Sequence, residues 1–350
     1  IENLVGTHAS NRLLRGKELA NLPMIPQAYI LVEDGIIADM GHMYELETRI
    51  PQLPKTVVDC SGQWVLPAWC DSHTHLVFAR SREEEFIDKI NGLSYANIAA
   101  KGGGILNSAR RLEETSEDEL FRLAWDRLQE WSAKGTGAME IKSGYGLSVA
   151  AELKMLRGIK RLQAQSNVSI KASFLGAHTY PLAFRENHEG YIQQIIDEML
   201  PVIQQEKLAD YIDVFCETGF YSPEEMERIV RAGQAIGLKP KLHVNQLNSI
   251  GGLQKAIALK AVSVDHLETM TKQDILDLAA SDTIGTLLPT AAYFLRMPYQ
   301  PARAIIDAGA AVALASDFNP GSSPSGNMNT VVSMSCIQMK MLPEGNGSIK

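Results

Sequence analysis

The sequence predicts an α/β protein in which a (β/α)8 TIM barrel follows a small β-rich domain. Two observations predict the barrel. From residue 65 onward in this 350-residue chain, strand-like segments alternate with helix-like segments, and eight such strands can be counted. The competing doubly wound sheet usually carries a Gly-x-Gly-x-x-Gly turn between a strand and a helix, and no such turn is present.

The N-terminal part, residues 1–64, predicts the small β-rich domain. Residues 28–40 contain two strand-like runs around Asp34-Gly35, a pair that favours a type I′ hairpin turn. Further strands are expected at 56–60 and 63–65. A β unit this small closes a core poorly on its own, so we expect C-terminal sequence that this chain lacks to complete it.

The barrel is expected to span residues 65–350. Its strands are short apolar runs that are bounded by turn residues and alternate with helical periodicity. The expected strands are 65–77, 136–143, 169–178, 209–217, 239–245, 262–268, 283–290 and 311–317.

Several of the expected helices carry their own start signals. A capping box, in which a Ser or Thr is followed three residues later by an acidic residue, begins at Ser116, at Ser222 and, in a weaker form, at Thr271. Pro223 follows Ser222 at the first helical position, where proline is favoured. Pro301 is expected to open a further short helix.

Composition and charge exclude several classes of partner. The net charge is −8 and no basic cluster is present, which argues against a nucleic-acid or anionic-membrane partner. No apolar run approaches the roughly 20 residues of a membrane span. The 4 cysteines form no Cys-x-x-Cys pair and are typical of reduced thiols in a cytoplasmic protein.

Histidines gather at the C-terminal ends of the expected strands. The chain has 8 histidines. Those that stand at strand ends are His73, His75, His178, His243 and His266. In a barrel, residues at these ends meet at one face whatever their distance in sequence. The clustering therefore predicts a metal site.

The expected metal ligands are His73, His75, His243 and Asp317. His73 and His75 are two residues apart in a strand, so both imidazoles point to one face. Three imidazoles and one carboxylate suit a single zinc or iron ion and leave one position open for water, as in catalytic sites. Asp317 could also accept a proton from that water, and His266 could polarise a substrate carbonyl.

Other segments near these strand ends suit a small polar ligand. Arg82 follows the first strand and could hold a carboxylate with two hydrogen bonds. Residues 101–104, Lys-Gly-Gly-Gly, and residues 319–324, which follow Asp317, offer flexible backbone and hydroxyl groups. The Glu83-Glu84-Glu85 run is interpreted as a solvent-facing helix start.

These residues resemble the amidohydrolase superfamily and, within it, the imidazolonepropionase family. The blocks that carry the resemblance extend over nearly the whole chain from about residue 28. They are Asp71-Ser72-His73-Thr74-His75-Leu76-Val77-Phe78, Gly102-Gly103-Gly104-Ile105, Lys142-Ser143-Gly144-Tyr145-Gly146, Gly176-Ala177-His178 and Asp317-Phe318-Asn319-Pro320-Gly321-Ser322-Ser323-Pro324.

The resemblance implies hydrolysis of the cyclic amide of 4-imidazolone-5-propanoate to N-formimidoyl-L-glutamate, a step of histidine degradation. It places the metal on the four ligands already named and implies a homodimer. The substrate contacts that it implies are Arg82, Tyr145, His178, Gln246, Asn319, Gly321 and Ser322. The Arg82 guanidinium would hold the propionate carboxylate, and His266 would steady the carbonyl oxygen as the tetrahedral intermediate forms.

One residue departs from the pattern of the family. Some members carry a glutamate, assigned to proton transfer, where this chain has Gln246. Gln246 thus stands at a catalytic position of the family. Glutamine cannot act as a base, so the substrate contact of Gln246 is retained and its part in proton transfer stays open. Either Asp317 or a neighbouring residue takes the proton of the water in this chain.

Other readings of the barrel stay open. A purine or aminopyrimidine deaminase shares the metal ligands, but it needs a carboxylate near position 246 and has no use for Arg82. A hydrolase with two metals bridged by a modified lysine is disfavoured because the fourth strand ends in Glu217. A barrel that only binds a ligand would show erosion of the metal ligands, and none is visible.

Overall fold

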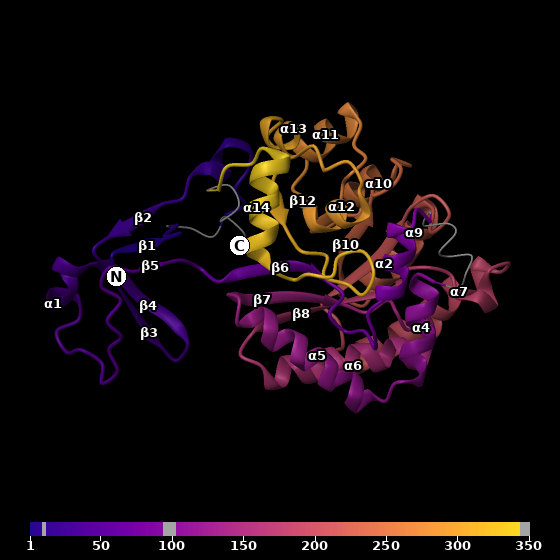
Figure 1. Ribbon diagram of the computed structural model, residues 1–350, viewed down its shortest axis with the longest axis horizontal. Helices are drawn as coiled ribbons and strands as arrows, with labels where there is room; N and C mark the ends of the chain where they lie inside the picture. Colours follow the sequence, from indigo (N-terminus) through magenta and orange to yellow (C-terminus); the bar gives the residue numbers. More distant parts are fainter. Residues whose placement is uncertain (9–11, 94–102, 344–350) are drawn as a thin grey trace.

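A computed structural model describes residues 1–8, 12–93 and 103–343 of the chain, and it confirms the predicted barrel. Eight strands form one parallel sheet in the order β13-β12-β11-β10-β9-β8-β7-β6, so each strand pairs with its neighbour in sequence (Figure 1). The strands are β6 (Trp69–Thr74), β7 (Thr136–Lys142), β8 (Ser169–Ala177), β9 (Tyr211–Cys216), β10 (Lys239–Val244), β11 (Ser263–His266), β12 (Ile284–Leu287) and β13 (Val312–Leu314).

Helices follow the strands and surround the sheet. Those after β6, β7 and β8 are α2 (Glu83–Ile90), α4 (Ile105–Glu114), α5 (Glu117–Ser132), α6 (Val149–Gln165), α7 (His188–Gln194) and α8 (Leu200–Glu206), with a 3-10 turn η3 (Leu182–Phe184) and a π-helix η4 (Ile195–Met199). Those after β9 to β13 are α9 (Pro223–Ala235), α10 (Gly252–Ala258), α11 (Lys272–Ala279), α12 (Pro289–Leu295), α13 (Ala302–Asp307) and α14 (Met328–Met339).

The first and last strands close the barrel. Thr74 and Phe318 form a parallel bridge. The backbone N–H of His75 donates to the carbonyl of Phe318 at 2.8 Å, and the N–H of Asp317 donates to the carbonyl of His73 at 3.0 Å. The carboxylate of Asp71 accepts hydrogen bonds from the backbone N–H of Ser316, at 3.0 Å, and from its hydroxyl. Closure therefore places the end of the last strand against His73 and His75.

The hydrophobic core lies between the strands and the helices, whereas the barrel interior is polar. On β7, Met139 and Ile141 belong to the hydrophobic core, while Glu140 and Lys142 alternate with them and are also buried. Because successive residues of a strand face opposite sides, Glu140 and Lys142 point into the barrel. The interior below the strand ends is consequently ionic.

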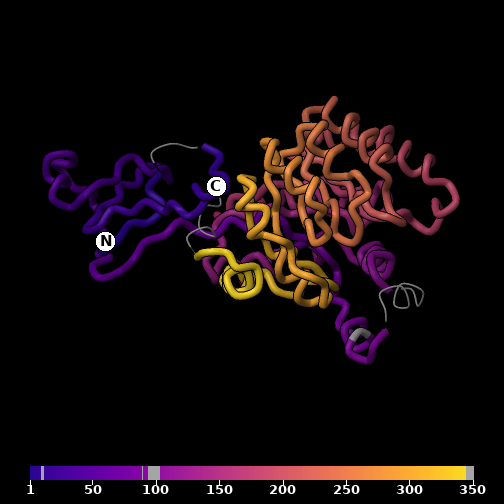
Figure 2. Tube along the Cα trace, turned by 90° about the horizontal axis from the view of Figure 1, so that it is seen from above, coloured from indigo at the N-terminus to yellow at the C-terminus, as the bar shows by residue number. Residues whose placement is uncertain are grey.

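The N-terminal part forms two small sheets to one side of the barrel (Figure 2). One sheet holds β1 (Asn3–Val5), β2 (Met24–Pro26) and β5 (Trp64–Val65), and the other is the predicted hairpin of β3 (Ala28–Glu33) and β4 (Ile36–His42). The other elements are η1 (Gly16–Ala20), η2 (Met43–Glu45) and α1 (Leu46–Arg49). Asp34 and Gly35 both have positive φ, 50° and 77°, as a type I′ turn requires.

Two sequence-based expectations for this region were wrong. Residues 56–60 form no strand. Val57 and Val58 are exposed, and the carboxylate of Asp59 bonds the backbone N–H of Ser61 at 2.9 Å, which makes a local turn instead. The strand expected at 65–77 is split after Val65, since Pro67 cannot donate a ladder hydrogen bond. The division of the chain at residue 64 stays a prediction.

The predicted helix starts are confirmed. Ser116, Ser222 and Thr271 each cap a helix by accepting a hydrogen bond from a backbone N–H three residues on. The reciprocal bond of a full capping box is present at Ser222 and Thr271. Helix α13 begins directly after Pro301, also as expected.

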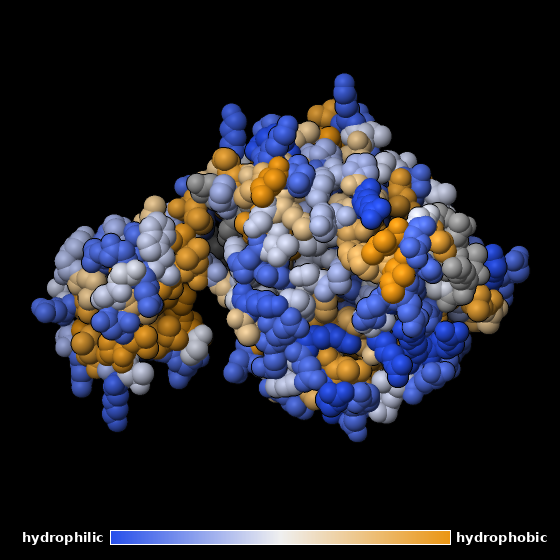
Figure 3. All heavy atoms as spheres, in the orientation of Figure 1, coloured by the Kyte–Doolittle hydropathy of each residue, from blue (hydrophilic) through white to orange (hydrophobic). Residues whose placement is uncertain are grey.

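The small sheets carry an exposed hydrophobic surface (Figure 3). Among the described residues up to 66, the large apolar side chains that are exposed are Leu13, Met24, Val32, Ile36, Ile37, Met43, Tyr44, Leu53, Val57, Val58, Trp64 and Leu66. Contiguous apolar surface of this kind is typical of a face that contacts another element or protein. Among the described residues, no helix is both long and apolar enough to cross a bilayer.

Replacing Asp71 with alanine tests the closure of the barrel. The change leaves the buried N–H and hydroxyl of Ser316 without their acceptor, which should lower the free energy of unfolding by about 1–3 kcal/mol. Urea denaturation of the metal-free protein measures this. The matched change Asp282→Ala removes a carboxylate whose side chain is 99% exposed and should cost less than about 0.5 kcal/mol. Equal effects would contradict the role given to Asp71.

Candidate metal centre and active site

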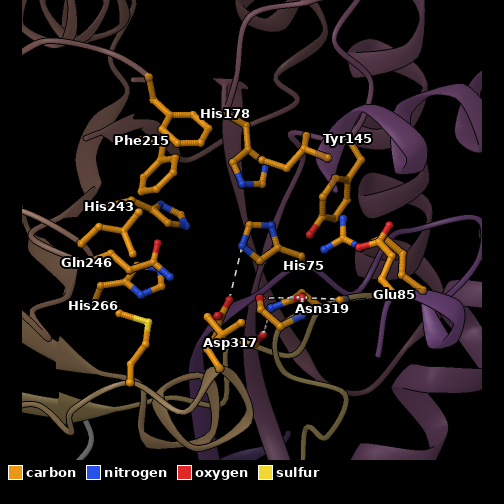
Figure 4. Close-up of a pocket in the computed structure, with 18 residues that line it drawn as sticks. His75, Glu85, Tyr145, His178, Phe215, His243, Gln246, His266, Asp317 and Asn319 are labelled. Carbon is orange, nitrogen blue, oxygen red and sulfur yellow. Dashed lines mark hydrogen bonds and ion pairs between the residues drawn. The ribbon is translucent and has the colours of Figure 1, made fainter. Parts of the chain in front are cut away.

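A pocket of about 240 Å³ opens at the C-terminal ends of the barrel strands (Figure 4). All of the expected site residues except His73 line it. Those lining residues are His75, Arg82, Tyr145, His178, His243, Gln246, His266, Asp317, Asn319, Gly321 and Ser322. Side chains from opposite sides of the barrel point toward its centre (Figure 4). The pocket is where the chemistry of this fold is expected.

Asp317 stands between His73 and His75 at one edge of the pocket. Its Oδ1 lies 3.4 Å from Nε2 of His73 and 3.6 Å from Nε2 of His75. All three side chains are buried. Two imidazole nitrogens and a carboxylate oxygen therefore converge on one point, the arrangement that a metal ion requires of its ligands.

His243 and His266 complete the cluster. Ring centroids of His73 and His243 are 4.5 Å apart, and those of His243 and His266 are 5.2 Å apart. Ligand atoms of His73, His243 and His266 lie within 4.8 Å of one another, as do those of His73, His75 and Asp317. From the sequence, His266 was expected to polarise a substrate carbonyl and not to bind the metal. The structure places it as close to the cluster as the expected ligands.

The protonation and the hydrogen bonding of the imidazoles suit binding of a metal ion. Nδ1 of His73 bonds the carboxylate of Asp265 at 2.6 Å, and Nδ1 of His243 lies 2.8 Å from the carboxylate of Asp213. Nε2 of both rings is buried without a hydrogen-bond partner, and the contact of Nδ1 of His243 with Asp213 is not a hydrogen bond either. Burial holds the pKa of His73, His75 and His243 well below the ordinary value, so the rings stay neutral and able to donate a lone pair. The chain is therefore built to hold a metal ion.

Strained backbone marks the strand ends that form the cluster. Asn245, His266, Leu267 and Asp317 all have positive φ, at 56°, 90°, 66° and 52°. Each such conformation costs a non-glycine residue about 1–3 kcal/mol. Of these four residues, His266 and Asp317 line the pocket.

The segment after Asp317 is held by Asn319. Its amide nitrogen donates to the Asp317 carbonyl at 2.7 Å, and its Oδ1 accepts from the backbone N–H groups of Gly321 and Ser322 at 2.9 and 2.7 Å. The side chain of Asn319 therefore shapes this loop as well as lining the pocket. At Gly321, a Cβ would lie 1.8 Å from Nη2 of Arg82, so only glycine leaves room for the guanidinium.

Arg82 is held at the pocket wall by buried polar groups. Its Nη1 donates to the hydroxyl of Ser108 at 3.1 Å, and its Nε lies 3.3 Å from Oε2 of Glu85. The other oxygen of Glu85 accepts from the N–H of Gly104 at 2.9 Å. Glu85 is buried and lines the pocket, so its interpretation as a solvent-facing residue was wrong. Residues 101 and 102 of the glycine-rich segment lie outside the described residues.

His178 and Tyr145 form the wall opposite Asp317. The ring of His178 stacks on His75 with centroids 5.3 Å apart, and Tyr145 lies 5.4 Å from His178. Nδ1 of His178 lies 3.0 Å from the carbonyl oxygen of Gly144. A carbonyl oxygen only accepts, so Nδ1 carries the proton and donates it. In the neutral ring, Nε2 on the opposite side is then a hydrogen-bond acceptor. The buried carboxylate of Glu152 fixes the loop by accepting three backbone N–H groups, those of Gly144, Gly146 and Leu147.

Gln246 lines the pocket next to His243 and is half-buried. The loop that follows is held by Glu217, whose carboxylate accepts from the N–H groups of Leu247 and Asn248 at 2.8 and 3.1 Å. Glu217, at the end of the fourth barrel strand, therefore holds the backbone of a loop and does not contact the ligand pocket.

Two features of the site were not predicted from the sequence. One is an ionic group inside the barrel, behind the histidines, and the other is an apolar wall of the pocket. The ionic group consists of Glu140, Lys142, Asp213, Lys241 and Asp265, all buried. The apolar wall consists of Ile105, Phe215, Phe220, Leu247, Leu295 and Met297. Charged residues at alternate positions of strands that are otherwise apolar were the available signal for the ionic group. No comparable pattern marked the wall.

Comparison with known proteins identifies the family. No family model matches the chain. An imidazolonepropionase of Flavobacterium johnsoniae is 56% identical over 330 residues, which cover 94% of this chain and 79% of that protein. The chain belongs to the imidazolonepropionase family. Imidazolonepropionases of Flavobacterium psychrophilum and Clostridium tetani are 53% and 42% identical, over 94% and 93% of this chain and 79% and 78% of those proteins.

Solved structures with low sequence identity share the fold. An E. coli guanine deaminase superposes with a TM-score of 0.69 at 12% identity, over 95% of this chain and 75% of that chain. An atrazine chlorohydrolase from Arthrobacter aurescens, complexed with zinc, has a TM-score of 0.64 at 13% identity, over 97% and 75% of the two chains. At such identities the likeness establishes the barrel architecture alone.

The affinity for a metal ion should depend on pH through Asp317. Burial raises the pKa of this carboxyl to about 7 in the metal-free protein, so it holds a proton below pH 7 that a metal must displace. Affinity should rise up to tenfold per pH unit toward pH 7 and then level off. Competition with a chromogenic chelator between pH 5.5 and 8.5 measures this. A pH-independent affinity, or an unchanged profile in Asp317→Asn, would contradict it.

Proposed function

We propose that this chain catalyses the metal-dependent hydrolysis of the cyclic amide of 4-imidazolone-5-propanoate to N-formimidoyl-L-glutamate, a step of histidine degradation. The observation that carries the proposal is that, in a member of this family, one pocket joins a His/Asp cluster to the guanidinium of Arg82. The cluster suits hydrolysis, and the guanidinium suits a substrate that carries a carboxylate.

The metal would be a single zinc or iron ion held by His73, His75, His243 and Asp317. When bound, such an ion lowers the pKa of a water molecule toward neutrality and polarises a carbonyl oxygen. The protein contributes neutral imidazoles. Nε2 of His73 and of His243 has no hydrogen-bond partner, and ligand atoms of these two rings lie within 4.8 Å of each other. Zinc and iron both accept imidazole and carboxylate ligands, so these four residues do not distinguish between the two metals.

The substrate would lie across the pocket between the cluster and Arg82. The propionate carboxylate would meet the guanidinium of Arg82, which Gly321 leaves room for. Tyr145 and His178, on the wall opposite Asp317, would hydrogen-bond the imidazolone ring. The remaining substrate contacts are proposed for Gln246, Asn319, Gly321 and Ser322. Arg82 fixes the end of the substrate that does not react, which orients the ring amide toward the histidines.

His266 would stabilise the oxygen of the scissile carbonyl. Burial alone would lower its pKa, but the neighbouring carboxylate of Glu268, 3.4 Å from Nδ1, raises the pKa of His266 above its ordinary value. Gln300 donates to the same carboxylate oxygen at 2.9 Å and holds it in place. A ring that keeps a proton can donate to an oxygen as negative charge develops on it.

Hydrolysis adds water across the amide bond of the ring. The carbonyl carbon gains the water oxygen, the C–N bond breaks, and the ring nitrogen leaves with a proton. Gln246 cannot carry that proton. We assign the transfer to Asp317, whose carboxylate stands at the cluster within 4 Å of Nε2 of His73 and of His75.

The assembly and location of the enzyme are also proposed. We infer a homodimer that acts in the cytoplasm, with the small β-rich domain ending at residue 64 and the barrel beginning at residue 65. Among the described residues, Cys60, Cys70 and Cys216 are free thiols, which supports a reducing compartment. Light scattering of the purified protein tests the dimer directly.

Turnover of the proposed substrate tests the assignment. Metal-loaded protein should remove the ultraviolet absorbance of freshly prepared imidazolone propionate. A chelator should abolish the loss, and Asp317→Asn should lower the rate by at least about 100-fold, because it removes both a ligand and the proton acceptor. Folded, metal-replete protein that leaves the absorbance unchanged would refute the substrate assignment.

Changes at Arg82 and Gly321 test how the carboxylate is held. Arg82→Met should raise KM about 10- to 100-fold, as expected for a lost charge-assisted hydrogen bond of about 1.5–3 kcal/mol, and should leave metal affinity unchanged. Gly321→Ala should raise KM in the same direction by displacing the guanidinium. Gly158→Ala, where an added Cβ meets nothing within 4 Å, is the matched control. An unchanged KM in both pocket variants would exclude this site for the carboxylate.

A further inference from the structure

Lys142 lies at the centre of the ionic group inside the barrel. Its Nζ is 3.0 Å from Oε1 of Glu140, 2.8 Å from Oδ2 of Asp213 and 3.7 Å from Oδ2 of Asp265. The side chain is fully buried and does not line the active-site pocket. It therefore contacts neither solvent nor substrate, and its role has to be sought in the carboxylates around it.

Two of these carboxylates hold the histidines of the cluster. Asp213 contacts His243 at two places: its Oδ1 accepts a hydrogen bond from the backbone N–H at 3.1 Å, and its Oδ2 lies 2.8 Å from the ring Nδ1, close enough for an ion pair but without a hydrogen bond. Asp265 bonds Nδ1 of His73 at 2.6 Å through Oδ2. In both aspartates, the oxygen that faces the ring is also the oxygen nearest to Lys142.

We propose that Lys142 is a positioning residue of the metal centre, which acts through Asp213 on His243 and through Asp265 on His73. One ammonium orients both carboxylates, and each carboxylate fixes one ring with Nε2 directed at the cluster. Carboxylates behind metal-bound histidines set the tautomer and the orientation of the ring. The inference rests on the proposed metal centre and deepens it.

The other buried lysine of the group cannot take this role alone. Nζ of Lys241 contacts Asp265 and lies 2.9 Å from the hydroxyl of Ser263. Among the described residues, Lys142 is the lysine whose ion pairs join Asp213 to Asp265. Loss of Lys241 would loosen His73, whereas loss of Lys142 would loosen both histidines.

A role in stability alone does not account for this arrangement. Buried ion pairs are expensive to desolvate and often add little to stability compared with apolar residues of the same size. Here the five charged side chains occupy the barrel interior, where a TIM barrel ordinarily packs branched apolar residues. Their contacts with two imidazoles give the network a function that an apolar core could not supply.

The variant Lys142→Met tests the proposal because it keeps the length of the side chain and removes the charge. Cobalt(II) serves as the probe, since its visible spectrum reports the geometry of its ligands. We expect the dissociation constant for cobalt to rise about 10- to 100-fold, as for other residues behind metal ligands, and the spectrum to change. At saturating metal, kcat should fall while KM stays unchanged, because Lys142 does not line the pocket.

Lys154→Met controls for the general effect of removing a lysine that is tied to backbone. Its Nζ donates to the carbonyls of Leu112 and Thr115 at 2.8 and 2.7 Å, far from the histidines in the fold. This variant should lose stability but keep the cobalt affinity and spectrum of the wild type. If Lys142→Met does not fold, Lys142→Gln, which removes the charge and keeps a hydrogen-bond donor for Asp213, takes its place.

The outcomes separate the two proposals. Wild-type protein that binds no cobalt would refute the metal centre itself. Wild-type protein that binds cobalt, together with a folded Lys142 variant of unchanged affinity and spectrum, would overturn the positioning role alone. A weaker affinity and an altered spectrum in the Lys142 variant, with neither change in Lys154→Met, would establish it.

Discussion

The site depends on the pairing that closes the barrel. When the end of the last strand bonds the first strand, the backbone N–H of Asp317 reaches the carbonyl of His73, and the carboxylate of Asp71 holds Ser316. Asp317 then stands within 4 Å of Nε2 of two histidines that lie at the opposite end of the barrel sequence. Without this closure, the ligands of the first and last strands would not meet, and the pocket would lack one wall.

A second constraint concerns what fills the barrel below the site. Histidines that donate lone pairs to a metal need their other nitrogens oriented. Here Asp265 bonds Nδ1 of His73, and Asp213 lies 2.8 Å from Nδ1 of His243. Buried carboxylates in turn need cations, so the barrel interior carries Lys142 and Lys241 in place of apolar side chains. The hydrophobic core is consequently confined to the layer between the strands and the helices, where Met139 and Ile141 pack.

The sequence predicted the barrel well because strand periodicity, turn residues and helix caps all agree from residue 65 onward. It failed at 56–60, where two valines favour a strand but Asp59 turns the chain and no strand among the described residues pairs with this segment. The sequence placed His266 among the histidines of the cluster, but the burial of Glu85 could not be predicted, since it depends on contacts with Gly104 and Asn107 of a separate segment. Lys142 stood inside a recognisable motif, yet its neighbours come from β9 and β11 and become visible only in three dimensions.

The central claim is that one metal ion sits among Nε2 of His73, Nε2 of His75, His243 and the carboxylate of Asp317. Crystals of metal-loaded protein, measured above and below the absorption edge of the metal, test this most directly. The account predicts one anomalous peak bonded to these four residues, with Nδ1 of His73 still on Asp265. A peak elsewhere, or one in which His266 replaces a histidine of this set, would contradict it.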